Sequence, residues 1–154
     1  ETKDNSANPW TSFTTQIAKV SVDTETGQVR LLKLTTAHDV GTVINPIGFH
    51  GQINGGAMQG IGYGLTEELV LENGYVQTSS FADYKLPSIA DIPELQAVLL
   101  EPSTGIGPYN VKGIGEHSNA QTAPAIANAV EAAVGVRIRD LPVTAEKVLR
   151  ALQG

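Results

Sequence analysis

Polar and apolar positions nearly alternate in the first part of the chain and predict a β-hairpin. Residues 13–22 carry apolar or β-branched side chains at close to every second position, and residues 29–34 form a second strand-like run. Residues 23–27 lie between the two runs and are rich in turn-forming types. A second hairpin is expected at residues 69–77, where an Asn-Gly turn separates two short apolar runs.

Apolar residues at helical spacing predict three helices. The first is expected from about residue 47 to 68, after the Asn45-Pro46 pair, because Asn is a frequent N-cap and Pro is favoured at the first helical position. The second is expected to begin at a capping box formed by residues 118–121 and to end at Gly135. Thr144 is expected to cap a last short helix.

The remaining segments complete the prediction of the fold. Residues 95–100 are typical of a strand, whereas residues 81–94 and 102–116 contain Pro and Gly and are expected to be irregular. Hairpins and helices mix without a repeated β-α-β order, so we predict an α+β fold, a two-layer mixed sheet with helices. Residues 1–12 are expected to be a flexible lead-in, and residues 13–154 a single domain.

Composition narrows the classes of function. The net charge is −6 and no block of Lys or Arg occurs, so nucleic acid and anionic membranes are not expected as partners. The absence of cysteine excludes disulfides, thiolate metal sites and Fe–S clusters on this segment, and a cytoplasmic location is expected. The chain opens on Glu1 with a sequence that resembles an interior segment, which indicates an excised piece or a processed subunit.

A carboxylate after two closely spaced glycines is the first candidate for chemistry. In residues 111–116, Val-Lys-Gly-Ile-Gly-Glu, the glycines allow the backbone to turn sharply beside a bulky group. Glu116 is expected at the mouth of the second helix, where the helix dipole favours an ionised acid that can accept a proton. From the pattern alone, a helix-capping role for Glu116 is the more common explanation.

A glycine-rich helix holds the second candidate. Six glycines fall between residues 48 and 62, and each costs about 1 kcal/mol in a helix interior relative to Ala. Such a helix is expected to approach another backbone or a ligand, although tight packing of the helix on a sheet explains some of these positions. The amide of Gln59 offers donors and an acceptor to a heterocycle or phosphate; the alternative is an ordinary surface glutamine. The histidines lack metal-ligand spacing and are interpreted as ordinary polar residues, with His117 of interest because it adjoins Glu116.

Taken together and in order, these segments resemble the molybdopterin-binding large subunit of the xanthine dehydrogenase and aldehyde oxidase family. The resemblance covers about residues 13–152, and its specificity lies in the ordered set and not in any single match. The matching segments are residues 39–41, 44–46, 51–53, 56, 59–62, 67–68, 83–87, 91–93, 112–116, 125–129 and 141–142.

The resemblance implies a catalytic role and a cofactor. In this family the Glu of the Gly-x-Gly-Glu motif is the active-site base, which corresponds to Glu116. The Gln of the Gln-Gly-x-Gly motif contacts the pterin, so Gln59, Gly60 and Gly115 are expected to bind the cofactor, with no metal ligand from the protein. The cofactor implied is molybdenum-molybdopterin, as such or in its dinucleotide form. The reaction implied is oxidative hydroxylation of an N-heteroaromatic, purine-like substrate or an aldehyde with water-derived oxygen, Glu116 removing a proton from a molybdenum-bound hydroxyl.

The resemblance also implies partners. Fe–S clusters and FAD are expected on partner subunits or domains, and the remainder of the large subunit is expected to complete the cofactor site, because this chain corresponds only to its C-terminal half. The isolated chain is therefore expected to be inactive. Residues 117–121 differ from the sequence that many relatives carry there, at a place where the substrate could be selected. Two alternatives stay open: a non-catalytic assembly or scaffold module, and an unrelated α+β binding domain.

Overall fold

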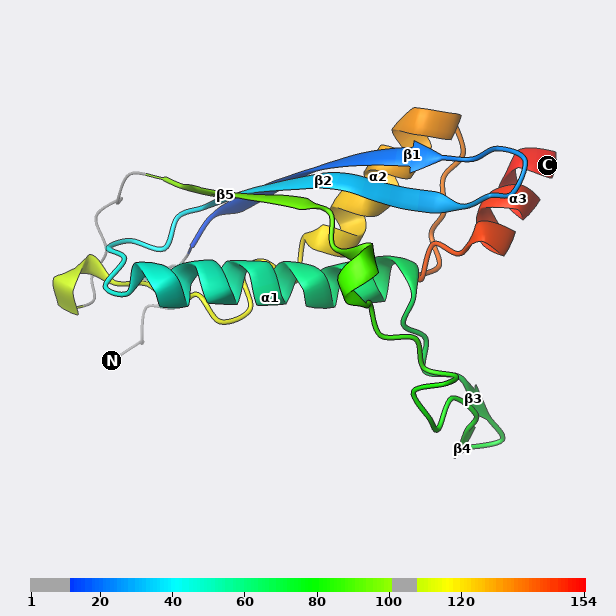
Figure 1. Ribbon diagram of the computed structural model, residues 1–154, viewed down its shortest axis with the longest axis horizontal. Helices are drawn as coiled ribbons and strands as arrows, with labels where there is room; N and C mark the ends of the chain where they lie inside the picture. The colour runs from blue at the N-terminus through cyan, green and yellow to red at the C-terminus, as the bar shows by residue number, and fades with distance from the viewer. Residues whose placement is uncertain (1–11, 101–107) are drawn as a thin grey trace, which may run out of the picture.

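The computed structural model describes residues 12–100 and 108–154. Apart from Ser12, the lead-in predicted for residues 1–12 lies outside the described residues, as does the first part of the loop predicted at 102–116. The described residues form one mixed sheet covered by helices, and a small separate hairpin (Figure 1).

The sheet has three strands in the order β1-β2-β5. β1 (Thr14–Val22) and β2 (Val29–His38) are the antiparallel strands of the predicted hairpin, and Gly27 closes their turn at a φ of 74°. β5 (Glu94–Leu99) pairs with β2 in parallel, which makes the sheet mixed. Half-buried and exposed residues alternate along β1, because the helices cover one face of the sheet and leave the other open.

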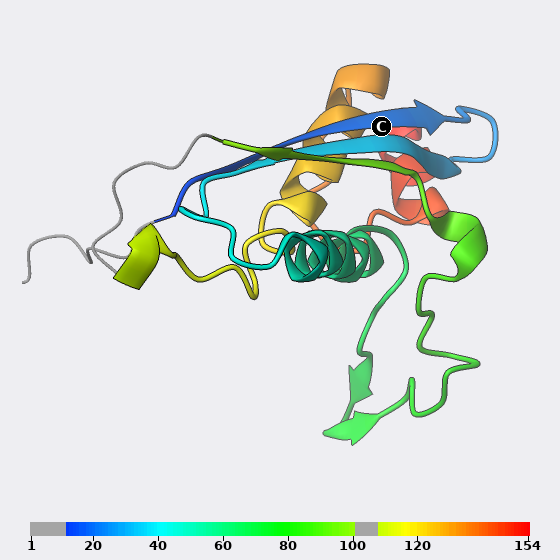
Figure 2. The same cartoon turned by 60° about the vertical axis from the view of Figure 1, so that its left-hand side comes forward.

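The described residues form three α-helices, α1 (Pro46–Leu65), α2 (Thr122–Val134) and α3 (Ala145–Gln153). α1 begins where predicted, because the Asn45 side chain accepts a hydrogen bond of 2.9 Å from the Gly48 N–H. α1 runs along one side of the sheet and packs against α2, which lies against β1 (Figures 1 and 2). The predicted α+β two-layer fold is confirmed. In the described part of the chain, no helix combines the length and apolarity needed to cross a bilayer.

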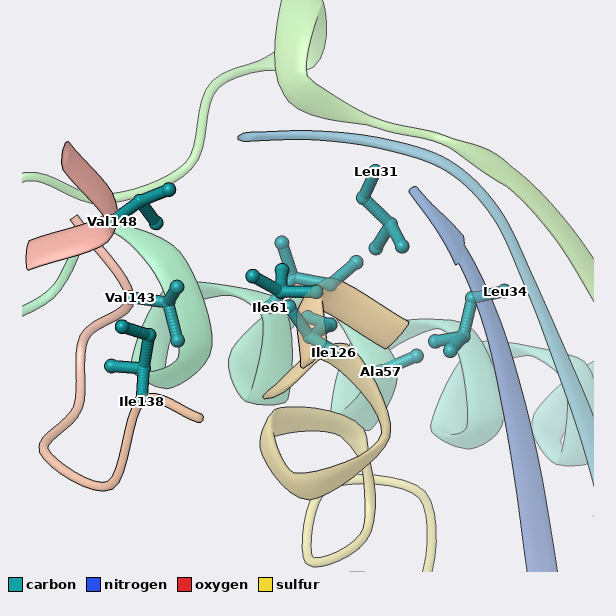
Figure 3. Close-up of a cluster of buried hydrophobic side chains, with 9 residues drawn as sticks. Leu31, Leu34, Ala57, Ile61, Ile126, Ile138, Val143 and Val148 are labelled. Carbon is teal, nitrogen blue, oxygen red and sulfur yellow. The ribbon is translucent and has the colours of Figure 1, made fainter. Parts of the chain in front are cut away.

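A bulge in β2 explains why Leu31 and Leu34 both enter the core. Residues three positions apart in a regular strand would face opposite sides of the sheet. The pairing of β1 with β2 shifts between Lys19 and Val20, and this leaves Leu32 as an extra residue in β2. Leu31 and Leu34 therefore both point toward the helices, where they are 6% and 0% exposed (Figure 3). The cluster that they join consists of Ala57, Ile61, Ile126, Val130, Ile138, Val143 and Val148.

The second predicted hairpin projects from the body of the molecule. β3 (Leu71–Glu72) and β4 (Tyr75–Val76) pair with each other alone among the described strands, on the side of α1 away from the sheet (Figures 1 and 2). The segment around them, including the short 3-10 helix η1 (Ile89–Asp91), is rich in exposed apolar side chains. These include Leu69, Val70, Leu71, Tyr75, Phe81, Leu86 and Ile89.

The predicted start of the second helix is wrong. α2 begins at Thr122, and its N-cap residue Gln121 makes no side-chain capping bond. Ser118, predicted to cap, is instead fully buried, and its hydroxyl donates to the Gln52 carbonyl of α1 at 3.3 Å. A tertiary contact has thus taken the hydroxyl that a local cap would need. The predicted end is confirmed, since Gly135 is left-handed at a φ of 76°.

Candidate functional site

The glycines of α1 allow the turn before α2 to lie directly on the helix. A Cβ placed on Gly60 would lie 2.5 Å from the Thr122 Cβ and 2.8 Å from the Asn119 carbonyl oxygen. Gly56 likewise meets the Ser118 side chain with no room for a Cβ. The close approach predicted from these glycines is confirmed, but the packing partner is the turn before α2, together with the first residue of that helix, and not the sheet. Helix α1 therefore forms the floor on which the turn after Glu116 rests.

Gln59 and the Glu116 segment are brought together on this floor. The Gln59 side chain is exposed, and its amide donates to the Tyr63 hydroxyl at 2.8 Å. The Asn119 amide donates to the Gln59 side-chain oxygen at 2.8 Å, and the Asn119 backbone N–H donates to the Glu116 carbonyl at 3.3 Å. Gly60 is buried beneath this link, and its contact with a cofactor stays a prediction.

Glu116 does not sit at the mouth of a helix. α2 begins six residues later, and the residues between form turns, so the expected helix-dipole effect on Glu116 is wrong. Glu116 is exposed at the surface of the described chain. A Cβ on either Gly113 or Gly115 would meet no atom within 4 Å. Packing in the described residues does not explain these two glycines, and they leave room beside the carboxylate for a bulky group.

The exposed face of α1 also carries glycines that packing in the described residues does not explain. Gly51 and Gly55 precede Gln59 at intervals of four residues, so the three positions share one helix face. A Cβ added to either glycine would have no atom within 4 Å, unlike one added to Gly56 or Gly60 on the packed face. The Gln59 amide thus stands beside bare helix backbone, which a large planar or polyanionic group can approach closely. These residues fit a pterin cofactor.

The loop that carries Glu116 begins at a buried ion pair that the sequence patterns did not predict. The Lys112 ammonium lies 2.6 Å from a carboxylate oxygen of Asp39, and the two side chains are 6% and 7% exposed. The Lys112 backbone N–H also donates to the Val40 carbonyl at 3.0 Å. The signals present in the sequence were the position of Asp39 directly after a strand and that of Lys112 directly before the glycine pair.

Two histidines adjoin this ion pair. His38 is fully buried, and its ring nitrogens have no hydrogen-bond partner among the described residues. Burial, and to a smaller extent the charge of His117, lowers the pKa of His38 to about 4. Burial also lowers the pKa of His117, with Asp39 opposing this effect and Lys112 adding to it. Both imidazoles are therefore neutral near pH 7. No group of three or more His, Asp or Glu in residues 12–100 and 108–154 is arranged to hold a metal ion.

A pocket of about 300 Å³ opens beside the same loop. Its walls come from the segment after β2, from the first turns of α1 and from the start of the Glu116 loop, and they are mainly apolar. The apolar lining residues are Val40, Val43, Ile44, Phe49, Val111 and Ile114. Ile44 is 68% exposed at the pocket, so this apolar surface is uncovered in the described chain.

Residues 1–93 match the family model of the molybdopterin cofactor-binding domain. The chain belongs to this family. The match covers α1 with Gln59, while Glu116 lies beyond its end. The resemblance to the molybdenum-binding subunits of xanthine dehydrogenases and aldehyde oxidoreductases is confirmed by the relatives that share the sequence and by the fold.

Known relatives are much longer than this chain. A probable xanthine dehydrogenase subunit from Bacillus subtilis (strain 168) is 36% identical over 141 residues, 92% of this chain and 19% of that protein. A probable hypoxanthine oxidase from Escherichia coli (strain K12) is 38% identical over 138 residues, 88% of this chain and 14% of that protein. An aldehyde oxidoreductase structure from Desulfovibrio gigas is similar at a TM-score of 0.85 and 34% identity, over 93% of this chain and 16% of that one. The chain spans less than a fifth of each of these three proteins.

Proposed function

We propose that this chain is the C-terminal part of the large subunit of a molybdenum hydroxylase and that Glu116 is its catalytic base. The observation that carries the proposal is the link from Gln59 through Asn119 to Glu116, which places the two motifs side by side. Uncovered glycine backbone flanks both residues, at Gly55 and Gly115. A cofactor that met this surface would contact Gln59 and Gly115 while Glu116 faced its reactive side.

In the proposed reaction each residue has a defined task. The cofactor, when bound, supplies the two-electron oxidation of a substrate carbon. Gln59 and Gly115 contact the pterin, and Asn119 holds the Gln59 amide in one orientation. Gly60, which is buried on the packed face of α1, supports this contact by letting the turn that carries Asn119 lie against the helix. The Glu116 carboxylate takes up the proton released as water-derived oxygen adds to the substrate carbon, which requires an ionised acid within hydrogen-bond reach. Gly113 and Gly115 let the loop backbone approach the cofactor without hindrance from side chains.

The rest of the site is proposed to come from other parts of a larger assembly. The apolar pocket beside Ile114 and the exposed apolar side chains around β3 and β4 are surfaces that such neighbours would cover. We propose that the remainder of the large subunit covers them and that Fe–S clusters and FAD on partner subunits or domains carry the electrons away. The isolated chain, which lacks these parts, is expected to show no turnover. Under this proposal the pterin is used either as such or as a dinucleotide.

The proposed substrate is an N-heteroaromatic, purine-like compound or an aldehyde. Relatives of both kinds are similar to this chain: one is named a probable hypoxanthine oxidase and another an aldehyde oxidoreductase. Residues 117–121 follow the base directly, and the structure gives Ser118 and Asn119 structural contacts there. Selection of the substrate is therefore proposed to rest with the other residues of this segment and with parts of the assembly outside this chain.

The test compares turnover of the parent complex with that of its Glu116→Gln variant. The amide keeps the shape of the side chain but cannot take the proton, so we expect kcat to fall by roughly 10²–10⁴-fold. Molybdenum content should stay unchanged, because Gln59 and the glycines are intact. Glu25→Gln, at an exposed position in the β1–β2 turn, is the matched control and should leave kcat unchanged. A Glu116→Gln enzyme that contains molybdenum and turns over at the normal rate would refute the assignment.

A further inference from the structure

Lys112 and Asp39 form the one buried ion pair among the described residues. Their charged atoms are 2.6 Å apart and their side chains are 6% and 7% exposed. Lys33 and Glu94 form a pair of nearly the same length, 2.7 Å, but these side chains are 33% and 66% exposed. The two pairs thus join the same types of charge, one inside the protein and one at its surface.

The buried pair lies at the N-terminal end of the loop that carries Glu116. The Lys112 backbone N–H donates to the Val40 carbonyl at 3.0 Å, and the Asn110 carbonyl accepts from the Thr42 N–H at 3.1 Å. Gly41, at a φ of 65°, has no room for a Cβ because the Asn110 carbonyl lies against it. Residues 110–112 are therefore fastened to the segment that leaves β2.

The C-terminal end of the loop, at Ser118, is also held by tertiary contacts. Ser118 is fully buried, and its carbonyl accepts from the Gln16 amide of β1 at 2.6 Å and from the Thr122 hydroxyl at 2.6 Å. Residues 113–117 lie between these two ends, and a Cβ added to either of their two glycines would have no atom within 4 Å. The two fixed ends, rather than packing of the loop itself, thus determine where Glu116 lies.

A buried ammonium is stable only where a carboxylate faces it, because an unpaired charge in the interior loses its solvation without compensation. Asp39 supplies that carboxylate, so the Lys112 side chain is held against the segment that leaves β2. We propose that Lys112 is a positioning residue for Glu116: its buried ion pair with Asp39 sets the placement of the loop in which the Glu116 carboxylate reaches the proton that it removes. This inference rests on the proposed role of Glu116.

The test uses the parent holoenzyme with Lys112→Met, which keeps an unbranched apolar stem one atom shorter than that of Lys and removes the charge, and Lys33→Met as the matched control. We expect Lys112→Met to lower kcat by about 10–100-fold, the size of effect that a displacement on the order of 1 Å produces. KM and molybdenum content should be unchanged. Amide hydrogen exchange should accelerate more in residues 113–117 than in β1, β2 and β5, beyond the general acceleration caused by leaving the Asp39 carboxylate unpaired. Lys33→Met should alter none of these quantities.

Asp39→Asn provides a second route, because it keeps the shape of the partner and removes only its charge. It should reproduce the kcat loss and the faster exchange, and the double variant should lose no more than the worse single variant, since both changes break one pair. Normal kcat with unaltered exchange in Lys112→Met or Asp39→Asn would overturn the proposal. So would an acceleration of exchange in residues 113–117 no greater than that in β1, β2 and β5, which indicates a general structural role. If Glu116→Gln is fully active, the role of Glu116 fails, while the exchange of residues 113–117 still decides whether the ion pair fixes the loop.

Discussion

Replacement of single glycines in α1 by alanine should change stability in opposite directions on the two faces of the helix. At Gly60 a Cβ would lie 2.5 Å from the Thr122 Cβ and 2.8 Å from the Asn119 carbonyl oxygen. Carbon atoms in good contact are about 3.5–4.0 Å apart, so the turn must move by on the order of 1 Å. At Gly55 a Cβ meets nothing within 4 Å.

The magnitudes follow from these contacts. Overpacking costs about 1–3 kcal/mol, and the upper end applies at Gly60 because the atoms in the way belong to a backbone and a Cβ rather than to a flexible side-chain end. Alanine gains about 1 kcal/mol over glycine in a helix interior. Gly60→Ala should therefore lower the free energy of unfolding by about 2 kcal/mol, while Gly55→Ala should raise it by about 0.5–1 kcal/mol.

Urea denaturation of the 154-residue chain, followed by circular dichroism, measures both changes as shifts of the midpoint at constant slope. Each variant serves as the control for the other, because the two share the helix, the substitution and the solvent conditions. If Gly60→Ala proved as stable as Gly55→Ala, the close approach of α1 to the turn before α2 would be incorrect. The support that this turn gives to Glu116 would then lose its basis.

Two further predictions concern His38 and Gln59. Because the pKa of His38 is lowered to about 4, the folded state takes up a proton at lower pH than the unfolded state does. The contribution of neutral His38 to the free energy of unfolding is therefore fully present above pH 6.5. This free energy should fall by up to about 3 kcal/mol as the pH drops toward 4. Urea denaturation across this pH range should show that most of the decrease in the free energy of unfolding disappears in His38→Leu. The decrease should persist in His50→Gln, a matched change at an exposed position. If the decrease in His38→Leu equalled that of the unchanged chain, His38 would not be its cause. Gln59→Ala in the parent complex should lower molybdenum content, measured by elemental analysis, whereas Asn54→Ala, exposed on the same helix, should not; full metal content in Gln59→Ala would argue against cofactor contact.

The sequence alone predicted the elements whose signals are local. β1 follows from alternation, the β3–β4 hairpin from its Asn-Gly turn, the start of α1 from the Asn45-Pro46 pair, and the end of α2 from Gly135. Each of these signals depends on residues that are near one another in the sequence. The ordered motifs were also sufficient to indicate the family. They selected Gln59 and Glu116 as candidates, although nothing local indicated that the two segments touch.

Tertiary structure decided which polar groups serve the site. Ser118 looked like a helix cap, yet its hydroxyl bonds to Gln52, 66 residues away in sequence. Lys112 and Asp39 are 73 residues apart, and no periodic pattern links them. Local patterns in the sequence specified strands and helices, and the ordered motifs that resemble the family indicated the candidate base. The placement of that base depends on burial, because a charge or hydroxyl removed from water must find a partner wherever the folded chain provides one.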